Sequence, residues 1–393
     1  MSDCDVKEFK LCELLKIYNG TKYDHLNKGD IPLYGSGGLM SHVDEALYSG
    51  EAILLPRKGT LSNIMYVNES FWTVDTMYYA VVNDKLADAF YLYSYLSQLD
   101  LSNLDSGSTL PSMTKSAYES IVVKLPDLKI QKAVATILFN IRKKLETNNK
   151  INQELEAMAK TLYDYWFVQF DFPDQNGKPY KSSGGKMVYH PELKREIPEG
   201  WGVETLKDFE SKIITGKTPS RANSDNFGGE IPFITIGDIR GNTFIYSTSE
   251  TLTDLGASVQ QNKYLPEGSL CVSCIATVGE IGFTTEWSHT NQQINSIVFE
   301  DETNRYYLYF ALKNYFENAN ASAKTGNTFA NMNKEDFSGI RIILPRNEIK
   351  NNFHKMTEPY FAQIKCLQGQ NQELTQLRDW LLPMLMNGQV KVE

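Results

Sequence analysis

The sequence predicts an α/β (α+β) protein in which two mixed α/β globules are joined by two long helices that form an antiparallel coiled coil with pseudo-two-fold symmetry. Three observations lead to this prediction: an internal repeat, a heptad pattern that closes each copy of the repeat, and short strand-like runs without a βαβ rhythm. A chain of 393 residues is also too long for one hydrophobic core and suits two to four domains.

The repeat is visible when residues 107–155 are shifted by 219 positions, because they then align without a gap with residues 326–374. Twelve residues coincide over these 49 positions, where ordinary composition gives roughly three by chance. The repeated unit is much longer than the ~20–50 residues of solenoid and propeller repeats. It therefore indicates a duplicated domain, and a protein with two copies tends to act on two similar objects or on the two halves of one.

Each copy begins with a strand-like, turn-rich part whose landmarks recur in the same order. Ile31-Pro32 matches Ile231-Pro232, and Gly50 precedes a strand-like run as Gly268 does in the second copy. Short β-rich runs alternate with breaks made of Gly, Asn and Ser. This pattern predicts globules with a mostly antiparallel or irregular sheet, since no nucleotide-binding fingerprint supports a doubly wound fold.

Each copy ends with a Leu-Pro pair followed by a long helix that carries a heptad seam. A helix of about 40 residues is roughly 60 Å long, and it must pack on something equally long, for which the helix of the other copy is the obvious partner. The predicted seam residues are Val134, Leu138, Ile141, Leu145, Asn152, Leu155 and Leu162 in the first helix and Phe353, Tyr360, Ile364, Leu367, Asn371, Leu374 and Leu381 in the second.

Two asparagines, Asn152 and Asn371, occupy the same position of this seam. A polar residue in a seam costs stability and can fix the register; alternatively, both side chains face solvent at the edge of the helix. The segment between the two copies is rich in Pro and Gly and is typical of a linker. The predicted domains are the first globule at 1–128, the first helix at 129–170, the linker at 171–200, the second globule at 201–346 and the second helix at 347–388.

The charge balance is acidic, with 39 Lys and Arg against 48 Asp and Glu and a net charge of −9. This argues against non-specific phosphate binding by the whole molecule, but it leaves room for local basic surfaces and for partner chains that supply positive charge. Five cysteines do not make a disulfide framework in a chain of this length. With no signal peptide and no apolar run that approaches the ~20 residues of a membrane span, we expect a cytoplasmic protein without a membrane partner.

The patterns that normally carry chemistry are weak. Cys271 and Cys274 have the spacing of half a zinc site, but no second Cys pair follows, so packing as small hydrophobic residues is favoured. The Gly-rich stretch 34–38 lacks the Walker lysine and the Rossmann spacing, which favours a surface turn over a phosphate loop. No methyltransferase tetrapeptide, serine-hydrolase elbow or histidine cluster is present. We therefore predict no catalytic residue and no metal ligand.

Short polar residues on Gly-rich loops beside basic residues do recur. Lys115 and Lys334 follow such loops at equivalent places in the two copies. These residue types read base edges or grip phosphates, although solvated loops or shared loop capping would give the same pattern. The predicted DNA-binding residues are Gly35, Ser36, Arg57, Lys58, Thr60, Ser108, Thr109, Lys115, Lys217, Arg221, Arg240, Gln292, Gln293, Asn327 and Lys334.

Three segments near the middle of the chain resemble the central conserved region of the specificity subunits of Type I restriction-modification systems. They are Tyr-Trp-Phe-Val-Gln-Phe-Asp-Phe-Pro at 165–173, Asn-Gly-Lys-Pro-Tyr-Lys-Ser-Ser-Gly-Gly-Lys-Met at 176–187 and Ile-Pro-Glu-Gly-Trp at 197–201. Further matches are Gly-Lys-Thr-Pro at 216–219 and the Leu-Pro pair at 125–126 that leads to Gln131. The resemblance covers essentially the full chain. The second copy carries Lys350 where the first has Gln131, so the two helix starts need not be equivalent.

The resemblance implies a DNA-reading subunit without catalytic activity of its own. Each globule would be a target-recognition domain that contacts one half of a split sequence in double-stranded DNA, with the helices as a spacer. Two modification subunits would bring S-adenosylmethionine and methylate adenine, and two restriction/translocase subunits would bring ATP and magnesium. The chain itself would hold no cofactor.

Two other classes of function stay open at this point. One is a coiled-coil adaptor, or a silent specificity allele, that binds partner subunits without reading DNA. The other is a DNA-modifying enzyme with an unrecognised site, which the missing methyltransferase tetrapeptide and metal cluster disfavour.

Overall fold

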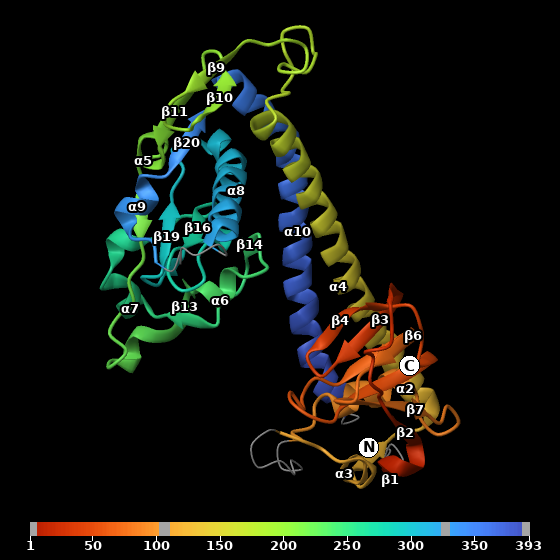
Figure 1. Ribbon diagram of the computed structural model, residues 1–393. Coiled ribbons are helices and arrows are strands. Elements are labelled where there is room, and N and C mark those ends of the chain that lie inside the picture. Colours follow the sequence, from red (N-terminus) through yellow and green to blue (C-terminus); the bar gives the residue numbers. More distant parts are fainter. Residues whose placement is uncertain (1–5, 102–110, 324–330, 387–393) are drawn as a thin grey trace. The chain divides into compact units, whose positions relative to one another are not determined.

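The structure is a computed structural model that describes residues 6–101, 111–323 and 331–386 (Figure 1). The chain forms two compact units: unit 1 is Met1–Lys144 with Leu374–Glu393, and unit 2 is Leu145–Glu373. Two long helices, α4 (Leu128–Tyr163) and α10 (Asn347–Met386), each have one part in either unit. Each unit therefore consists of one globule and parts of both long helices.

Unit 1 contains a six-stranded sheet with the strand order β2-β7-β5-β6-β3-β4. Its neighbouring strands are antiparallel except for β3 and β6, which are parallel. A separate antiparallel pair, β1 and β8, joins the start of the globule to the strand that leads into α4. The elements are β1 (Lys7–Lys10), α1 (Leu11–Leu14), β2 (Leu15–Asn19), β3 (Lys28–Gly35), β4 (Gly38–Val43), β5 (Tyr48–Pro56), β6 (Met65–Thr73), β7 (Met77–Val82), α2 (Ala89–Leu96), α3 (Lys115–Glu119) and β8 (Val122–Leu125).

Unit 2 contains a five-stranded sheet, β12-β19-β16-β17-β14, a three-stranded sheet, β15-β13-β18, and the pairs β9-β10 and β11-β20. The elements are the π-helical turn η2 (Asp164–Val168), β9 (Met187–His190), β10 (Arg195–Pro198), β11 (Gly202–Thr205), α5 (Leu206–Phe209), β12 (Ile213–Thr215), η3 (Ser224–Asn226), β13 (Phe227–Ile234), α6 (Ile236–Ile239), β14 (Phe244–Ile245), β15 (Glu250–Leu252), α7 (Asp254–Ser258), η4 (Gln261–Lys263), β16 (Leu270–Ser273), β17 (Ile281–Thr284), β18 (His289–Thr290), β19 (Ile294–Ile297), η5 (Glu302–Asn304), α8 (Arg305–Ala323), α9 (Lys334–Ser338) and β20 (Arg341–Leu344).

The second globule repeats the strand topology of the first. β11 pairs with β20 as β1 pairs with β8, and β12, β19 and β16 follow one another as β2, β7 and β5 do. The strands that carry the Ile-Pro pairs, β3 and β13, each have a parallel neighbour, β6 and β18 respectively. The predicted mixed α/β class with two domains and long helices is thus confirmed, while the coiled coil stays a prediction.

Within unit 2 the helices α4 and α10 run antiparallel. The Asn148 amide nitrogen donates to the Asn371 side-chain oxygen at 2.9 Å, and the rings of Tyr163 and Phe353 lie 6.2 Å apart between centroids. The contacts therefore move towards the start of α10 as they move towards the end of α4. Asn371 also donates to the Asn149 side-chain oxygen at 2.7 Å.

The residues predicted for the helix seam all lie buried or half-buried on α4 and α10. Asn152 is 9% exposed, so its side chain faces the interior rather than solvent. Asn371 is half-buried and bonds to Asn148, which lies one helical turn before Asn152. In unit 1, Leu381, Leu382 and Met386 of α10 pack against the core of the first globule.

The start of each long helix is fastened to its globule at the same position but by different chemistry. Buried Gln131 accepts a bond from the Asp88 backbone N–H at 3.0 Å and donates to the Pro126 carbonyl at 2.8 Å. Buried Lys350, its counterpart, forms an ion pair with the Asp301 carboxylate at 3.2 Å. Both partners lie at helix caps, since Asp88 caps α2 and Asp301 caps η5, the turn that precedes α8.

A second pair of equivalent positions fills an aromatic cage on each globule. The Arg142 guanidinium of α4 lies 5.7 Å from the ring centre of Tyr66, 5.9 Å from that of Phe90 and 5.8 Å from that of Tyr93. At the equivalent place on α10, the Phe361 ring stacks on Tyr306 at 4.1 Å and lies edge-on to Tyr309 at 5.5 Å. One copy thus fills its cage with a cation and the other with a ring.

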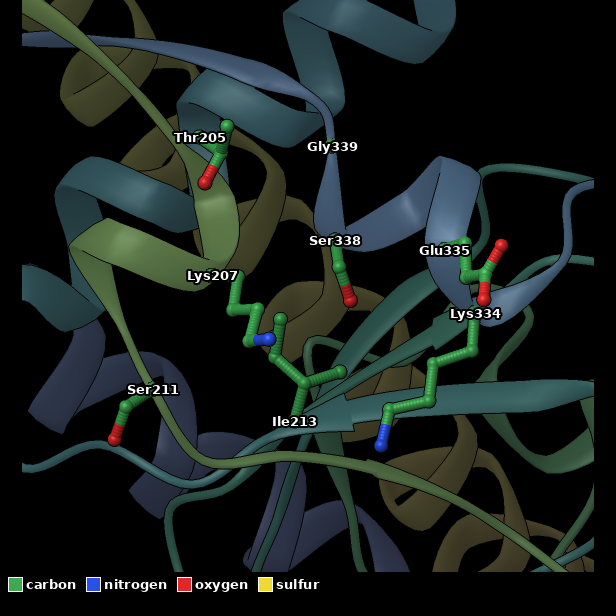
Figure 2. A pocket seen from close by; sticks show the side chains of 8 residues that line it. All are labelled: Thr205, Lys207, Ser211, Ile213, Lys334, Glu335, Ser338 and Gly339. Carbon is green, nitrogen blue, oxygen red and sulfur yellow. The ribbon is translucent and has the colours of Figure 1, made fainter.

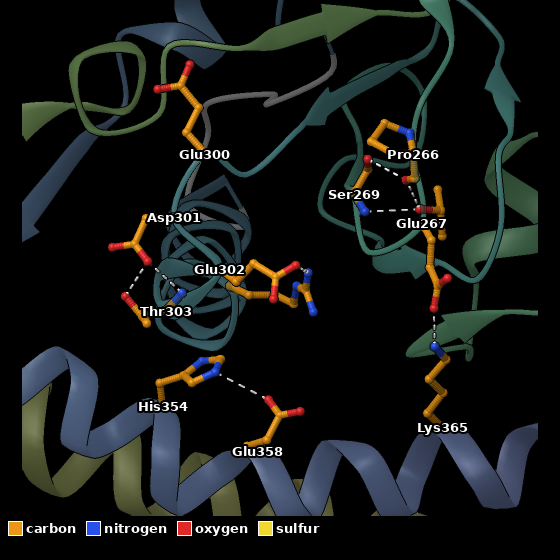
Figure 3. A network of polar contacts seen from close by, with 12 residues as sticks. Pro266, Glu267, Ser269, Glu300, Asp301, Glu302, Thr303, His354, Glu358 and Lys365 are labelled. Carbon is orange, nitrogen blue, oxygen red and sulfur yellow. Dashed lines mark hydrogen bonds and ion pairs between the residues drawn. The ribbon is translucent and has the colours of Figure 1, made fainter.

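Polar contacts add to the packing of α10 on the second globule (Figure 3). Lys365 forms an ion pair with Glu267, and its carbonyl accepts a bond from the Tyr246 hydroxyl at 2.8 Å. Asp301, which pairs with Lys350 of α10, also accepts local bonds from the backbone N–H and the hydroxyl of Thr303, at 2.9 and 2.7 Å. These contacts complement the apolar core that Phe353, Phe361 and Ile364 of α10 enter.

The segment between α4 and β11 is folded onto unit 2 by stacked aromatic rings. Phe172 stacks between Tyr180, at 4.7 Å, and Trp201, at 4.9 Å. The Asp171 carboxylate accepts bonds from the hydroxyl and backbone N–H of Ser182, and these bonds lower the pKa of Asp171. The predicted linker is therefore an ordered connection that includes the hairpin β9-β10. In the described part of the chain, no helix combines the length and apolarity that a bilayer crossing requires.

Candidate nucleic-acid interface

Four loops meet at one place in unit 1, and we call this place the loop junction of unit 1: residues 35–38, 57–63, 74–76 and 111–113. The Arg57 backbone N–H donates to the Thr76 carbonyl at 2.8 Å, and the Met113 N–H donates to the Arg57 carbonyl at 3.0 Å. The Asn63 side chain donates to the Ser36 carbonyl at 2.8 Å. Strand pairing places three of these loops side by side, since they follow β3, β5 and β6, and the bonds between the loops add the segment that precedes α3.

Gly59 shows how close this approach is. It adopts a φ of +90°, and a Cβ atom at this position would lie 3.1 Å from the Ser36 hydroxyl oxygen. A larger residue would therefore be strained by its backbone and would also push against the neighbouring loop.

The predicted residues Gly35, Ser36, Arg57, Lys58 and Thr60 all belong to this junction. Arg57, Lys58 and Thr60 are exposed, and the Arg57 guanidinium donates to the Asp75 carbonyl at 3.4 Å. Lys115 opens α3, two residues after Met113, and forms an i,i+4 ion pair with Glu119 at 3.6 Å. Ser108 and Thr109 lie outside the described residues.

Unit 2 repeats the same framework, and its loop junction comprises residues 235–240, 274–280, 291–293 and 331–332. The Cys274 N–H donates to the Gln293 carbonyl at 2.8 Å, and the Met332 N–H donates to the Cys274 carbonyl at 2.8 Å. These two bonds correspond to the bonds of Arg57, so Cys274 is the structural counterpart of Arg57. Ala276 then takes the place of Gly59 and keeps its left-handed backbone, with a φ of +66°, which is uncommon for a residue with a Cβ atom.

Polar side chains in this second junction come from several loops. Arg240 donates to the Glu280 carboxylate and to the Thr277 hydroxyl, both at 3.3 Å. The Gln292 side-chain oxygen accepts a bond from the Thr218 hydroxyl at 2.6 Å, and that of Gln293 accepts one from Asn291 at 3.1 Å. The predicted residues Arg240, Gln292 and Gln293 are therefore brought together at one place.

The other residues predicted in the second copy differ in their placement. Lys217 is exposed and adjoins the junction, because its backbone N–H donates to the Thr290 carbonyl at 3.0 Å. Arg221 forms a bidentate ion pair with Glu250 of β15, with both distances 2.8 Å, and this pair lowers the pKa of Glu250. Arg221 thus braces the three-stranded sheet. Asn327 lies outside the described residues.

Sequence reasoning did not single out Asn63, Asp75, Thr76 or Thr277, although the structure places all four in the junctions. Asp75 and Thr76 are the counterparts of Gln292 and Gln293 in the repeated framework. The signal that could have found them is the alignment of the two copies upstream of residue 107, where small insertions shift the register.

Cys271 and Cys274 lie on and next to β16 and are buried, as packed hydrophobic side chains would be. Burial raises the pKa of the Cys271 thiol to about 12 and that of the Cys274 thiol to about 11. Both are therefore neutral thiols near pH 7 and poor metal ligands. Over the described ranges 6–101, 111–323 and 331–386, no group of three or more His, Cys, Asp or Glu side chains could hold a metal ion.

Comparison with known proteins finds similarity to specificity subunits of Type I restriction enzymes. The family model described as "Type I restriction modification DNA specificity domain" matches residues 4–157 and 198–376. The Type I restriction enzyme HindI specificity subunit of Haemophilus influenzae is 33% identical over 335 residues, which cover 72% of this chain and 72% of that protein. The MjaIX specificity subunit of Methanocaldococcus jannaschii is 27% identical over 299 residues, covering 75% of this chain and 66% of that protein.

Among solved structures, the S subunit of a Type I restriction-modification system from M. genitalium matches 98% of this chain and 97% of its own, with a TM-score of 0.62. The two sequences share 13% identity, so this likeness concerns the fold.

Proposed function

Because the chain belongs to the family of Type I restriction-modification DNA specificity proteins, which recognise DNA target sequences, we propose that each of its loop junctions reads one half of a bipartite sequence in double-stranded DNA. The observation that carries this proposal is the duplication of one backbone framework with different side chains. Each framework presents four loops at one place, and the residues on them differ in charge and shape between the copies.

The two junctions suit different half-sequences. The first offers the exposed cations Arg57 and Lys58, for which the second has Cys274 and Ile275. The second offers Gln292 and Arg240 instead. Arg and Lys pair best with guanine in the major groove, and Gln pairs best with adenine. Two readers with such different side chains would recognise unlike base patterns.

The chemistry on DNA belongs, in this proposal, to partner subunits. Two modification subunits with S-adenosylmethionine methylate adenine within the recognised sequence, and two restriction/translocase subunits use ATP and magnesium. The chain supplies recognition and the surface on which these subunits assemble. Its own negative charge is consistent with partners that hold much of the DNA backbone.

The first test is a methylation assay with the purified chain alone, with the modification subunit alone and with both together. We expect adenine methylation only from the mixture, at one bipartite sequence that sequencing of methylated bases would identify. Methylation by the chain alone, or methylation by the mixture without sequence preference, would contradict the proposal.

The second test exchanges residues 1–125 for those of a relative with a different target. Since these residues form the first globule, we expect one half of the methylated sequence to change and the other half to stay. A change in both halves would refute the assignment of one junction to each half.

A further inference from the structure

A pocket of about 370 Å³ lies in unit 2 between α5, α9 and the start of β12. Its lining contains two lysines, Lys207 of α5 and Lys334 of α9, and the hydroxyl-bearing residues Thr205, Ser211 and Ser338 (Figure 2). The two lysine side chains reach towards the pocket from opposite sides in this view, and Ser338 points into the space between them. A cavity needs only about 10–15 Å³ by the same measure to hold one water molecule, so the pocket has room for a hydrated anionic group.

The ammonium groups of the two pocket lysines are not paired with carboxylates. Within residues 6–101, 111–323 and 331–386, neither Lys207 nor Lys334 forms an ion pair. Glu335 also lines the pocket, but its carboxylate points away from the Lys334 ammonium group (Figure 2). The lining therefore carries two ammonium groups, from Lys207 and Lys334, and one carboxylate, from Glu335, which points away from the Lys334 ammonium group.

Comparison of the two copies shows that the second has lost a neutralising partner. Lys115, the counterpart of Lys334, forms an ion pair with Glu119 at 3.6 Å. The residue equivalent to Glu119 is Ser338, because both lie in the stretch that aligns without a gap. Lys207 takes the place of Cys12, since Leu206 and Leu11 make equivalent backbone bonds to Ile340 and Ile121 at 2.8 Å.

The hydroxyl groups show which polar donor remains for a ligand. Thr205 already donates to the Asp208 carboxylate at 2.5 Å, and Ser211 donates to the Glu300 carboxylate at 2.7 Å. The Ser338 hydroxyl has no such partner in the part of the chain that the structure describes. It therefore supplies one donor beside two ammonium groups, which is the donor set that an oxyanion such as a phosphate requires.

The pocket adjoins the loop junction of unit 2. Met332 is anchored to the Cys274 carbonyl at 2.8 Å, Asn333 caps α9, and Lys334 is the first residue of that helix. Only one residue, Asn333, thus separates the pocket lysine from the framework that presents the reading loops. Phosphate contacts beside base-reading loops fix the register of a protein on duplex DNA without carrying sequence information.

We propose that the pocket formed by Lys207, Lys334 and Ser338 binds a backbone phosphate of DNA and anchors the second globule on its half-sequence. This inference rests on the proposed DNA-reading function and adds an asymmetry to it. The second copy contacts the DNA backbone through Lys334 of α9. In the first copy the equivalent lysine, Lys115, is neutralised by its ion pair with Glu119.

The test measures binding of the full chain, assembled with its modification subunits, to a labelled duplex with the methylated sequence and to a scrambled duplex over a range of salt concentrations. For K207A and K334A we expect binding to both duplexes to weaken by roughly three- to tenfold per lysine. The slope of log affinity against log salt should fall by about one for each lysine, because one phosphate contact is lost. The methylated sequence itself should not change.

Two further variants keep the lysines and change their neutralisation. S338E recreates on α9 the arrangement of Lys115 with Glu119, so it should weaken binding as a lysine deletion does. E335Q removes the anion at the rim and should strengthen binding. K178A removes an exposed lysine of unit 2 far along the chain from the pocket and serves as the control for net charge.

The possible outcomes distinguish a failure of the phosphate-site proposal from a failure of the proposed DNA-reading function. Equal affinities and salt slopes for wild type, K207A, K334A and S338E would overturn the phosphate site while leaving the DNA-reading proposal intact. Variants that assemble poorly with the modification subunits but bind DNA normally once assembled would also overturn it, since the pocket would then hold a carboxylate of a partner chain. Failure of the wild-type complex to prefer the methylated sequence would refute both.

Discussion

Positions 131 and 350 hold the same place at the start of a long helix, and at the scale of single residues they illustrate how far the copies have diverged. Gln131 bonds to main-chain atoms of the first globule, whereas Lys350 bonds to the Asp301 side chain. The exchange of an amide for a lysine is visible in the sequence. The distant partners, Asp88 and Asp301, are not visible there, because they lie more than 40 residues earlier in the chain and are brought close by the packing of the globule on the helix.

The ion pair of Lys350 makes stability depend on pH. Burial would raise the pKa of Asp301, but bonds from Thr303 and Lys350 hold it below its usual value. The stabilisation from this carboxylate is therefore complete above its unfolded pKa of about 3.9 and is lost as the pH falls towards the folded value. We expect K350M to lower the free energy of unfolding by about 1–2 kcal/mol at pH 7, because the carboxylate is half-exposed.

Urea unfolding of wild type and K350M between pH 3 and pH 7 would check this prediction, with K355M, an exposed lysine of the same helix, as the control. The difference between wild type and K350M should shrink as the pH falls below about 4. A difference that is constant over this range would show that Lys350 acts through packing alone.

The cages around Arg142 and Phe361 give a second prediction at this scale. Phe361 is fully buried among aromatic rings, so F361R would place a charge in a buried apolar site and should cost roughly 3–5 kcal/mol. R142F places a ring among the rings of Tyr66, Phe90 and Tyr93 and should cost less than about 2 kcal/mol. Urea midpoints of both variants would measure the asymmetry. Equal losses of stability in the two variants would contradict the predicted difference between the two cages.

At the scale of elements, the long helices were predictable because their signal is local and periodic. The residues of the predicted seam recur at heptad spacing within one helix, and all are buried or half-buried in the structure. It was harder to predict from the sequence which loops meet at each loop junction. Their loops are separated in each copy by whole strands, and only the pairing order of the sheet brings residues such as Ser36 and Asn63 into contact.

The asparagine contacts between α4 and α10 provide a test of pairing. N371L would leave the buried Asn148 amide without its bond to residue 371 and should lower the free energy of unfolding by about 1–3 kcal/mol. The double variant N148L/N371L removes both polar groups and should recover most of this loss. The four proteins form a double-mutant cycle that urea unfolding can measure. Strictly additive losses would show that the two amides do not depend on each other.

At the scale of the whole molecule, the proposed function predicts that the length of the two helices sets the gap between the two half-sequences that are read. Both helices pass from one unit to the other, α4 after Lys144 and α10 after Glu373. We expect seven residues inserted into both helices at these points to keep the heptad register and to lengthen each by about 10 Å. The gap between the two half-sequences should then grow by about three base pairs, at 3.4 Å each.

Sequencing of methylated bases in cells that carry the lengthened chain would measure this gap. The two half-sequences themselves should stay as they are, because both loop junctions are untouched. An insertion into α4 alone is the matched control, and it should abolish methylation by breaking the register of the pair. An unchanged gap in the doubly lengthened chain would contradict the role of the helices as a spacer.

The contrast between Gln131 and Lys350 also bears on how a gene of this kind can recombine. Gln131 requires only main-chain groups from the globule before it, so any incoming globule of the same fold satisfies it. Lys350 requires an acid at the position of Asp301, so a new second globule without that acid would leave a buried ammonium group unpaired. Crossovers upstream of residue 126 therefore leave the bonds of Gln131 intact, whereas those between residues 301 and 350 separate two codons that must be inherited together.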